Sequence, residues 1–153
     1  MQSLMFSRPF FSLIFALASL VGYAQLRNQE PWTENQLLEP LNLAAVINTP
    51  NAKQPTLISI GPGALIRGSI DIGPAKEKAN LEALRLYLTK LPKNRDIVIY
   101  CGCCPFQHCP NIRPAFQLLN EMKFTNHKLL ALRTNIKADW MNKGYPVTEL
   151  TTK

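Results

Sequence analysis

Four cysteines crowd into one short segment of the chain, and the sequence contains no others. They are Cys101, Cys103, Cys104 and Cys109. A disulfide between any two of them would close only a short loop, and the stabilisation that a disulfide provides grows with loop length. A stabilising framework therefore explains the cluster poorly. Its local character predicts a reactive thiol or a metal site.

Cys101 is the strongest candidate nucleophile of the four. It directly follows the β-branched run Asp96–Tyr100, which predicts a strand that fixes its Cα. Backbone amides of the loop, together with the amino terminus of a following helix, would stabilise a thiolate there. Such settings lower the pKa of a thiol and raise its nucleophilicity. Cys103, Cys104 and Cys109 lie farther along a loop with Pro105 and Pro110, where we expect looser positioning.

Two other chemistries use the same cluster. Cys101 and Cys104 form a Cys-x-x-Cys pair, which suits dithiol redox chemistry. A thioredoxin fold, with Pro146 as its cis-proline, is excluded because only seven residues follow this proline and that fold needs a further hairpin and helix. A soft-metal site for zinc or cuprous copper is the other alternative. Its ligands would be Cys103, Cys104, His108 and Cys109, although structural zinc sites usually add a second, separate knuckle.

The elements that must position this loop alternate between strands and helices. Strands are predicted at 56–60, 68–73, 96–100 and 128–132, and helices at 37–47, with Pro40 at a start or break, at 76–90 and after Asn111. This alternation implies a largely parallel sheet, in which sites form at the carboxyl ends of strands. The cysteine segment follows such an end.

Several single residues have predicted structural roles. We expect Asn111 to cap the helix after the cysteines and Pro114 to lie in its first turn. Trp32 is a candidate anchor against the core, and His127 is expected at a turn with a structural role. The segment 140–147 closes the domain.

In order, these elements resemble those of a rhodanese-like domain, a sulfurtransferase family, across roughly residues 32–148. Four segments carry the resemblance: Leu65–Ile70 before a short strand, Ile97–Cys101 at the central strand, Met122–Asn126 at a helix end, and Trp140–Val147 with its closing Gly-aromatic-Pro. The resemblance implies an α/β fold with a central, mostly parallel sheet flanked by helices, in a single domain over residues 25–153.

The resemblance also implies a cofactor-free activity. The Cys101 thiolate would take a sulfane sulfur from a small anionic donor such as thiosulfate, or from a protein thiol, and would pass it on. Arg113 would hold the anionic donor, or would instead pack on the loop and bond its carbonyls. Cys103, Cys104 or Cys109 would release the sulfur by forming a disulfide.

The chain also departs from the family pattern. Ser59 and Gly61 stand where the family usually has an Asp and an Arg, and Leu65 replaces its usual His. The loop is long, since Arg113 comes twelve residues after Cys101. These departures concern the donor and the acceptor more than the fold. No cysteine has an Arg at the spacing that phosphatase chemistry requires.

The N-terminus predicts export. Arg8, an apolar run from Phe10 to Val21 and the small residues of Gly22-Tyr23-Ala24 predict a signal peptide over residues 1–24. An uncleaved anchor is the alternative, but the run is shorter than the ~20 residues of a membrane span. We expect a secreted or periplasmic protein with no stable membrane span after cleavage.

The charge of the chain argues against nucleic-acid binding. The formal net charge is +7, and loss of Arg8 with the predicted signal peptide would leave +6. The basic residues are scattered, whereas nucleic-acid binders usually cluster them in a stripe.

Overall fold

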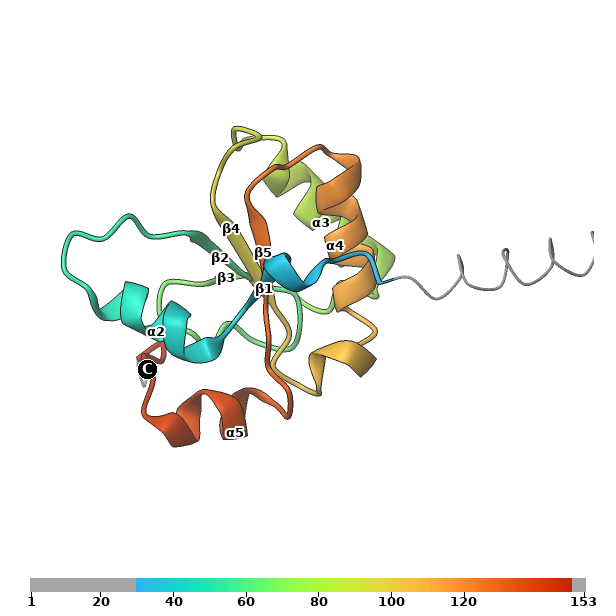
Figure 1. The fold of residues 1–153 in the computed structure, drawn as a ribbon. Coiled ribbons are helices and arrows are strands. Elements are labelled where there is room, and N and C mark those ends of the chain that lie inside the picture. Colours follow the sequence, from blue (N-terminus) through green and yellow to red (C-terminus); the bar gives the residue numbers. More distant parts are fainter. Residues whose placement is uncertain (1–29, 150–153) are drawn as a thin grey trace, which may run out of the picture. The chain divides into compact units, whose positions relative to one another are not determined.

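Five strands form one fully parallel sheet in the order β1-β5-β4-β2-β3 (Figure 1). The computed structural model describes residues 30–149 of the 153-residue chain, and the predicted signal peptide lies outside them. The strands are β1 (Leu37–Leu38), β2 (Thr56–Ser59), β3 (Ile70–Asp71), β4 (Ile97–Tyr100) and β5 (His127–Leu130). Within the described residues, no helix has the length and apolar character needed to cross a membrane.

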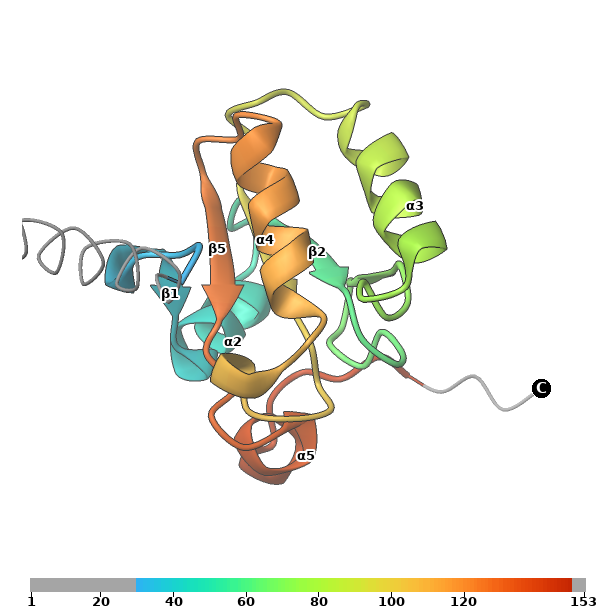
Figure 2. The ribbon, with the colours of Figure 1, turned by 90° about the vertical axis from the view of Figure 1, so that its right-hand side faces the viewer.

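Helices cover both faces of this sheet. α3 (Lys78–Leu88) and α4 (Ile112–Glu121) pack on one face, and α2 (Pro40–Asn48) and α5 (Ile136–Asp139) pack on the other (Figures 1 and 2). Three 3-10 turns complete the described elements: Glu34–Gln36, Phe106–His108 and Met141–Lys143. The predicted fold class, α/β with a central parallel sheet flanked by helices, is confirmed.

The central strand β4 is buried on both faces, as expected for a strand inside a parallel sheet. Because side chains alternate along a strand, Ile97 and Ile99 join the core beneath α3 and α4. Val98 and Tyr100 join the core beneath α2 and α5. Cys101 continues the alternation and belongs to the core on the α4 face.

The first element differs from the prediction. Leu37 and Leu38 were expected at the start of a helix, but they form β1 and pair with Leu129 and Leu130 of β5. The reason is Pro40, which disfavours helical backbone in the residue before it, so that Glu39 is extended (φ −68°, ψ 140°). The helix accordingly begins at the proline itself.

His127 lies on a strand and not at a turn. It is the first residue of β5 and pairs with Ile97. Its buried ring places Nε2 within hydrogen-bond distance of the side chains of Gln36 (3.2 Å) and Asn120 (2.8 Å). His127 also lines a cavity of about 570 Å³ at the amino ends of β4 and β5, whereas the cysteines follow the carboxyl end of β4. These contacts support the structural role that was predicted for it.

Two tryptophans fix the ends of the described chain. Trp32 packs edge-on against Phe106 and Phe116, with ring centroids 6.1 and 5.8 Å apart, and so is the predicted anchor. Trp140 is buried, and its Nε1 donates to the carbonyl oxygen of Pro146 at 2.9 Å. The closing segment therefore folds back onto the domain.

Candidate functional site

The cysteine loop, residues 101–111, runs from the carboxyl end of β4 to the start of α4 and contains a short helix (Figure 2). The loop is attached to the rest of the domain at two points. The backbone N–H of Phe106 donates to the carbonyl of Leu132, and the N–H of Ile136 donates to the carbonyl of Gly102, both at 2.9 Å. The Phe106 side chain is buried as well. The loop therefore has a defined conformation in spite of its length.

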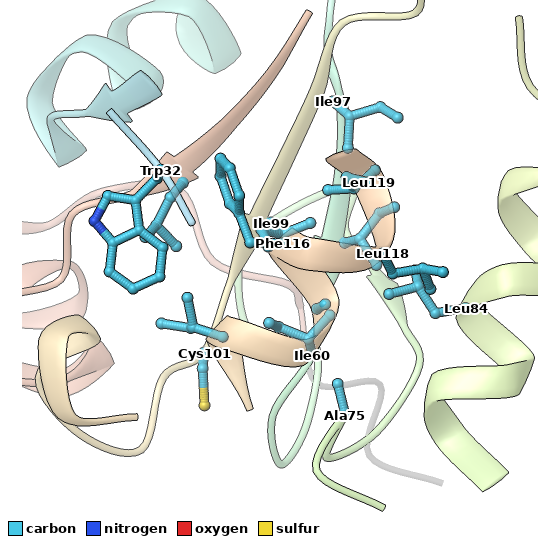
Figure 3. Close-up of a cluster of buried hydrophobic side chains, with 14 of the residues drawn as sticks. Trp32, Ile60, Ala75, Leu84, Ile97, Ile99, Cys101, Phe116, Leu118 and Leu119 are labelled. Carbon is cyan, nitrogen blue, oxygen red and sulfur yellow. The ribbon is translucent and has the colours of Figure 1, made fainter. Parts of the chain in front are cut away.

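Cys101 lies at the bottom of this loop with only 1% of its surface exposed. Its sulfur points away from the side chains of Ile99 and Phe116 that form the core above it (Figure 3). The sulfur occupies space that Gly61 leaves open, because a Cβ built on Gly61 would lie 2.5 Å from Cys101 Sγ. Gly61, which appeared in the sequence only as a departure from the family pattern, is thus part of the site.

The structure brings the four cysteines into one group of free thiols. Cys103 Sγ lies 3.3 Å from Cys101 Sγ and 3.2 Å from Cys104 Sγ. The sulfurs of Cys101, Cys103 and Cys109 all lie within 4.8 Å of one another. Cys103 is exposed and Cys104 partly exposed, so a chain of thiols connects the buried sulfur of Cys101 to the surface.

Cys109 differs from the expectation of loose positioning. It is completely buried, and its thiol hydrogen-bonds to the sulfur of Cys101. Its backbone N–H donates to the carbonyl of Phe106, while its own carbonyl accepts from the N–H of Ile112 at the start of α4. The turn that precedes α4 therefore holds Cys109 in place, which loop composition alone did not indicate.

Asn111 was predicted to cap α4 with its side chain, and this prediction is wrong. Asn111 occupies the N-cap position but makes no side-chain capping bond. Its Nδ2 donates to Cys101 Sγ at 3.4 Å, and its Oδ1 accepts from the backbone N–H of Lys76 at 3.1 Å. This side chain is 3% exposed, so the amide is a buried link between the thiol and the segment before α3.

These contacts stabilise the Cys101 thiolate. The hydrogen bond from the Cys109 thiol is the largest influence that lowers the pKa of Cys101 to about 5. Burial opposes it, because a charge is costly in a less polar environment. The backbone N–H of Cys103 and the side chains of Asn111 and Cys103 lower the pKa further. The expected amide cradle thus consists of one backbone amide and three side-chain donors.

The pKa values of the neighbouring thiols of Cys103 and Cys109 shift in the opposite direction and are raised. Desolvation, followed by hydrogen bonding to Cys104 and Cys101, raises the pKa of Cys103 to about 12. Because the Cys103 side chain is exposed, its two sulfur neighbours are the better physical cause. The hydrogen bond to Cys101, and then burial, raise the pKa of Cys109. Near neutral pH, Cys101 is therefore the anion, while Cys103 and Cys109 keep their protons and donate.

Arg113 and His108 lie at the rim of the loop. Arg113, the second residue of α4, donates from Nη2 to the carbonyl of Gln107 at 2.8 Å and stacks over the Trp32 ring. This is the loop-packing role that the sequence offered as one of two for Arg113. His108 is exposed in the short helix and lies outside the group of three close thiols found among the described residues.

The predicted site residues therefore differ in how closely they approach Cys101. Cys103 and Cys109 contact it directly, whereas Cys104 contacts Cys103 and Cys109. The sequence did not identify Gly61 and Asn111 as residues that contact the Cys101 thiol. Gly61 directly follows a buried apolar strand, and Asn111 immediately precedes a helix, but neither pattern shows that the residue meets the thiol.

Comparisons with known proteins establish the fold and little beyond it. No family model and no curated protein matches the chain. Three solved structures of EanB variants, each in complex with hercynine, are similar to it, with TM-scores of 0.51–0.52 and 15–16% sequence identity. The similarity covers 75–80% of this chain but only 28–29% of the EanB chains. At this identity the similarity shows that the chain shares an α/β fold with part of EanB.

Proposed function

We propose that this protein transfers sulfane sulfur through a persulfide on Cys101, as its resemblance to rhodanese-like domains implies. The observation that carries the proposal is the environment of Cys101 Sγ. A buried thiol at the carboxyl end of the central strand has four hydrogen-bond donors around it and a pKa of about 5. Such a thiol is ionised at neutral pH, and the thiolate is the form that attacks sulfur.

In the first step, the Cys101 thiolate attacks the outer sulfur of thiosulfate. A sulfur–sulfur bond forms to Cys101, the bond between the two donor sulfurs breaks, and sulfite leaves with the electron pair. Arg113, at the start of α4, is the proposed contact for the anionic donor. A small anion suits the site because Cys101 is almost completely covered, while the adjacent Cys103 is exposed and Cys104 is partly exposed.

Two routes then release the sulfur. An external nucleophile takes the terminal sulfur and regenerates the Cys101 thiolate. Alternatively, Cys103, whose sulfur lies 3.3 Å from Cys101 Sγ, gives its proton to water and attacks Cys101 Sγ as a thiolate. Hydrosulfide then leaves, a Cys101–Cys103 disulfide forms, and an external thiol reductant must restore the two thiols. The second route explains why a reactive thiol has further cysteines beside it.

Sulfite release measures the first step without any acceptor. The full-length reduced protein is mixed with thiosulfate, and sulfite is quantified against protein. We expect one equivalent from the wild type and none from Cys101→Ser. Cys104→Ser, which leaves in place the Cys103 and Cys109 thiols that contact Cys101, is the matched control and should still give one equivalent. Equal release from wild type and Cys101→Ser would refute the proposal.

Dithiol redox chemistry is a second candidate, favoured by the 3.3 Å separation of the Cys101 and Cys103 sulfurs. In that reaction the two thiols lose two electrons and two protons to an oxidant such as a disulfide, and a loop disulfide forms. Equilibration with glutathione redox buffers, followed by intact mass, tests it. If sulfite release fails but the loop oxidises reversibly as a pair, the redox function replaces sulfur transfer.

A further inference from the structure

We infer that the sulfurs of Cys101, Cys103 and Cys109 form a binding site for a single cuprous ion. Their mutual distances are all within 4.8 Å. Metal–thiolate bonds of about 2.3 Å place the sulfurs of a planar three-coordinate site about 4 Å apart. The three thiols therefore need only small side-chain adjustments to enclose a metal. This inference needs only the thiols and does not rest on the proposed sulfur transfer.

The scaffold around the three sulfurs is already arranged for binding. Cys101 follows β4, and Cys109 is fixed by the turn before α4, so two ligands come from rigid, buried positions. Gly61 leaves free the space beside the Cys101 sulfur. The buried Asn111 amide donates to the same sulfur, as outer groups commonly do around metal ligands. Cys103 is exposed and provides the side from which an ion enters.

Ligand type and number select the metal. Thiolate sulfur favours soft ions, chiefly cuprous copper and zinc, over magnesium or calcium. Structural zinc sites almost always have four ligands. Cys104 hydrogen-bonds with Cys103 and Cys109, but among the described residues neither it nor His108 belongs to the group whose sulfurs all lie within 4.8 Å of one another, and that group has three sulfurs. A three-coordinate sulfur site suits cuprous copper best. This set also replaces the one predicted from sequence, which included Cys104 and His108 and left out Cys101.

Copper binding and sulfur loading exclude each other, because both use the Cys101 sulfur. The consequence is a protein that loses its nucleophile when cuprous copper is present. Sulfite release should stop after one equivalent of copper is added and should return when a strong cuprous chelator removes it. Sulfite release that continues with one copper bound would place the ion elsewhere and overturn the inference.

A competition titration tests the site directly. Reduced full-length protein is titrated under anaerobic conditions with cuprous bicinchoninate, and the loss of chelator colour reports transfer. We expect one ion per chain, with affinity lowered at least tenfold in Cys103→Ser and Cys109→Ser, since even outer-shell losses cost about 10- to 100-fold. Cys104→Ser and His108→Ala should retain the wild-type affinity. Cys103 is exposed, so its variant tests the site even if Cys109→Ser fails to fold.

X-ray absorption at the copper edge counts the ligands independently of affinity. Three sulfurs and no nitrogen or oxygen are expected. A shell with a nitrogen ligand, or loss of binding in Cys104→Ser, would instead support the site predicted from sequence and overturn this one. If copper fails to bind while sulfite release proceeds, the inference fails alone and the proposed function stands.

Discussion

Gly61 and Cys101 lie just beyond the carboxyl ends of the neighbouring strands β2 and β4, so close that a methyl group on Gly61 would lie 2.5 Å from the Cys101 sulfur. The backbone around Cys101 is less crowded, since the same methyl group would lie 3.4 Å from Cys101 Cα. The conflict is therefore with the sulfur alone. We expect Gly61→Ala to destabilise the protein by about 1–3 kcal/mol, as overpacking of a core does, and to displace the thiol from its donors.

A double-mutant cycle isolates this contact. Chemical denaturation of Gly61→Ala is compared in the wild-type background and in Cys101→Ala, which removes the sulfur. The alanine at position 61 should cost much less stability when the sulfur is absent. An equal cost in both backgrounds would show that Gly61 is required for some other reason.

The pH at which Cys101 reacts should depend on Cys109. In the wild type, the rate of iodoacetamide alkylation at Cys101 should rise through pH about 5 and level off before pH 7, following the thiolate fraction. Cys109→Ala removes the largest stabilising hydrogen bond, so the pKa of Cys101 should rise toward the ordinary value of about 8.5. At pH 6 the rate should therefore fall: about twofold if the pKa rises by about one unit, and about tenfold if it rises by about two, because only a pKa above the working pH leaves the thiol mostly protonated.

Asn111→Asp provides an independent check on the same pKa. The carboxylate keeps an acceptor for the Lys76 N–H but cannot donate to sulfur, and its charge opposes a thiolate. The pKa of Cys101 should therefore rise here as well. Identical pH profiles for the wild type and both variants would contradict the account of the thiolate given above.

Gly61 and Asn111 also show what the sequence alone does not predict about the site. The strand before Cys101 and the parallel sheet follow from local patterns of apolar residues. Pro40 marks the start of α2, but the residues of β1 before it were predicted as helix. The roles of Gly61 and Asn111 do not follow from local patterns, because each depends on a segment distant in the chain that tertiary packing brings to the thiol. An asparagine before a helix has the same local signature whether it caps the helix or donates to a sulfur.

The position of Cys109 also could not be predicted from the residues around it in sequence. Its neighbours, above all Pro110, suggest a loosely held loop residue. Cys109 is nevertheless buried, and its backbone N–H and its carbonyl are both hydrogen-bonded. Burial of Phe106 against Trp32 pulls this part of the loop onto the domain. Loop composition carries no information about such an anchor 74 residues away in sequence.

Arg113 has two proposed roles, which a kinetic measurement separates. If Arg113 contacts the donor, Arg113→Ala should raise the KM for thiosulfate several-fold with little change in kcat, while the alkylation rate of Cys101 stays near that of the wild type. Arg113→Lys, which keeps the charge, should recover part of the loss. An unchanged KM with lower stability would assign Arg113 to packing on the loop, where it contacts Gln107 and Trp32.

The predicted signal peptide is tested by the N-terminus of the protein recovered from its producing cell. Cleavage after Ala24 should give a mature chain that begins at Gln25, measured by intact mass and N-terminal peptide mapping. Substitution of Ala24 by a bulky residue such as Leu should block cleavage, because the processing site requires small side chains. Protein from the cell envelope that retains Met1 would support the uncleaved anchor instead.

The central claim is that the sulfane sulfur resides on Cys101, and peptide mass mapping tests it most directly. The reduced protein is loaded with thiosulfate at pH 6, where Cys101 is ionised and Cys103 is protonated, and persulfides are then trapped by alkylation before digestion. We predict one added sulfur atom, located on Cys101 in the wild type and in Cys104→Ser. A sulfur located on Cys103, Cys104 or Cys109, or added at the wild-type rate to Cys101→Ser, would contradict the account.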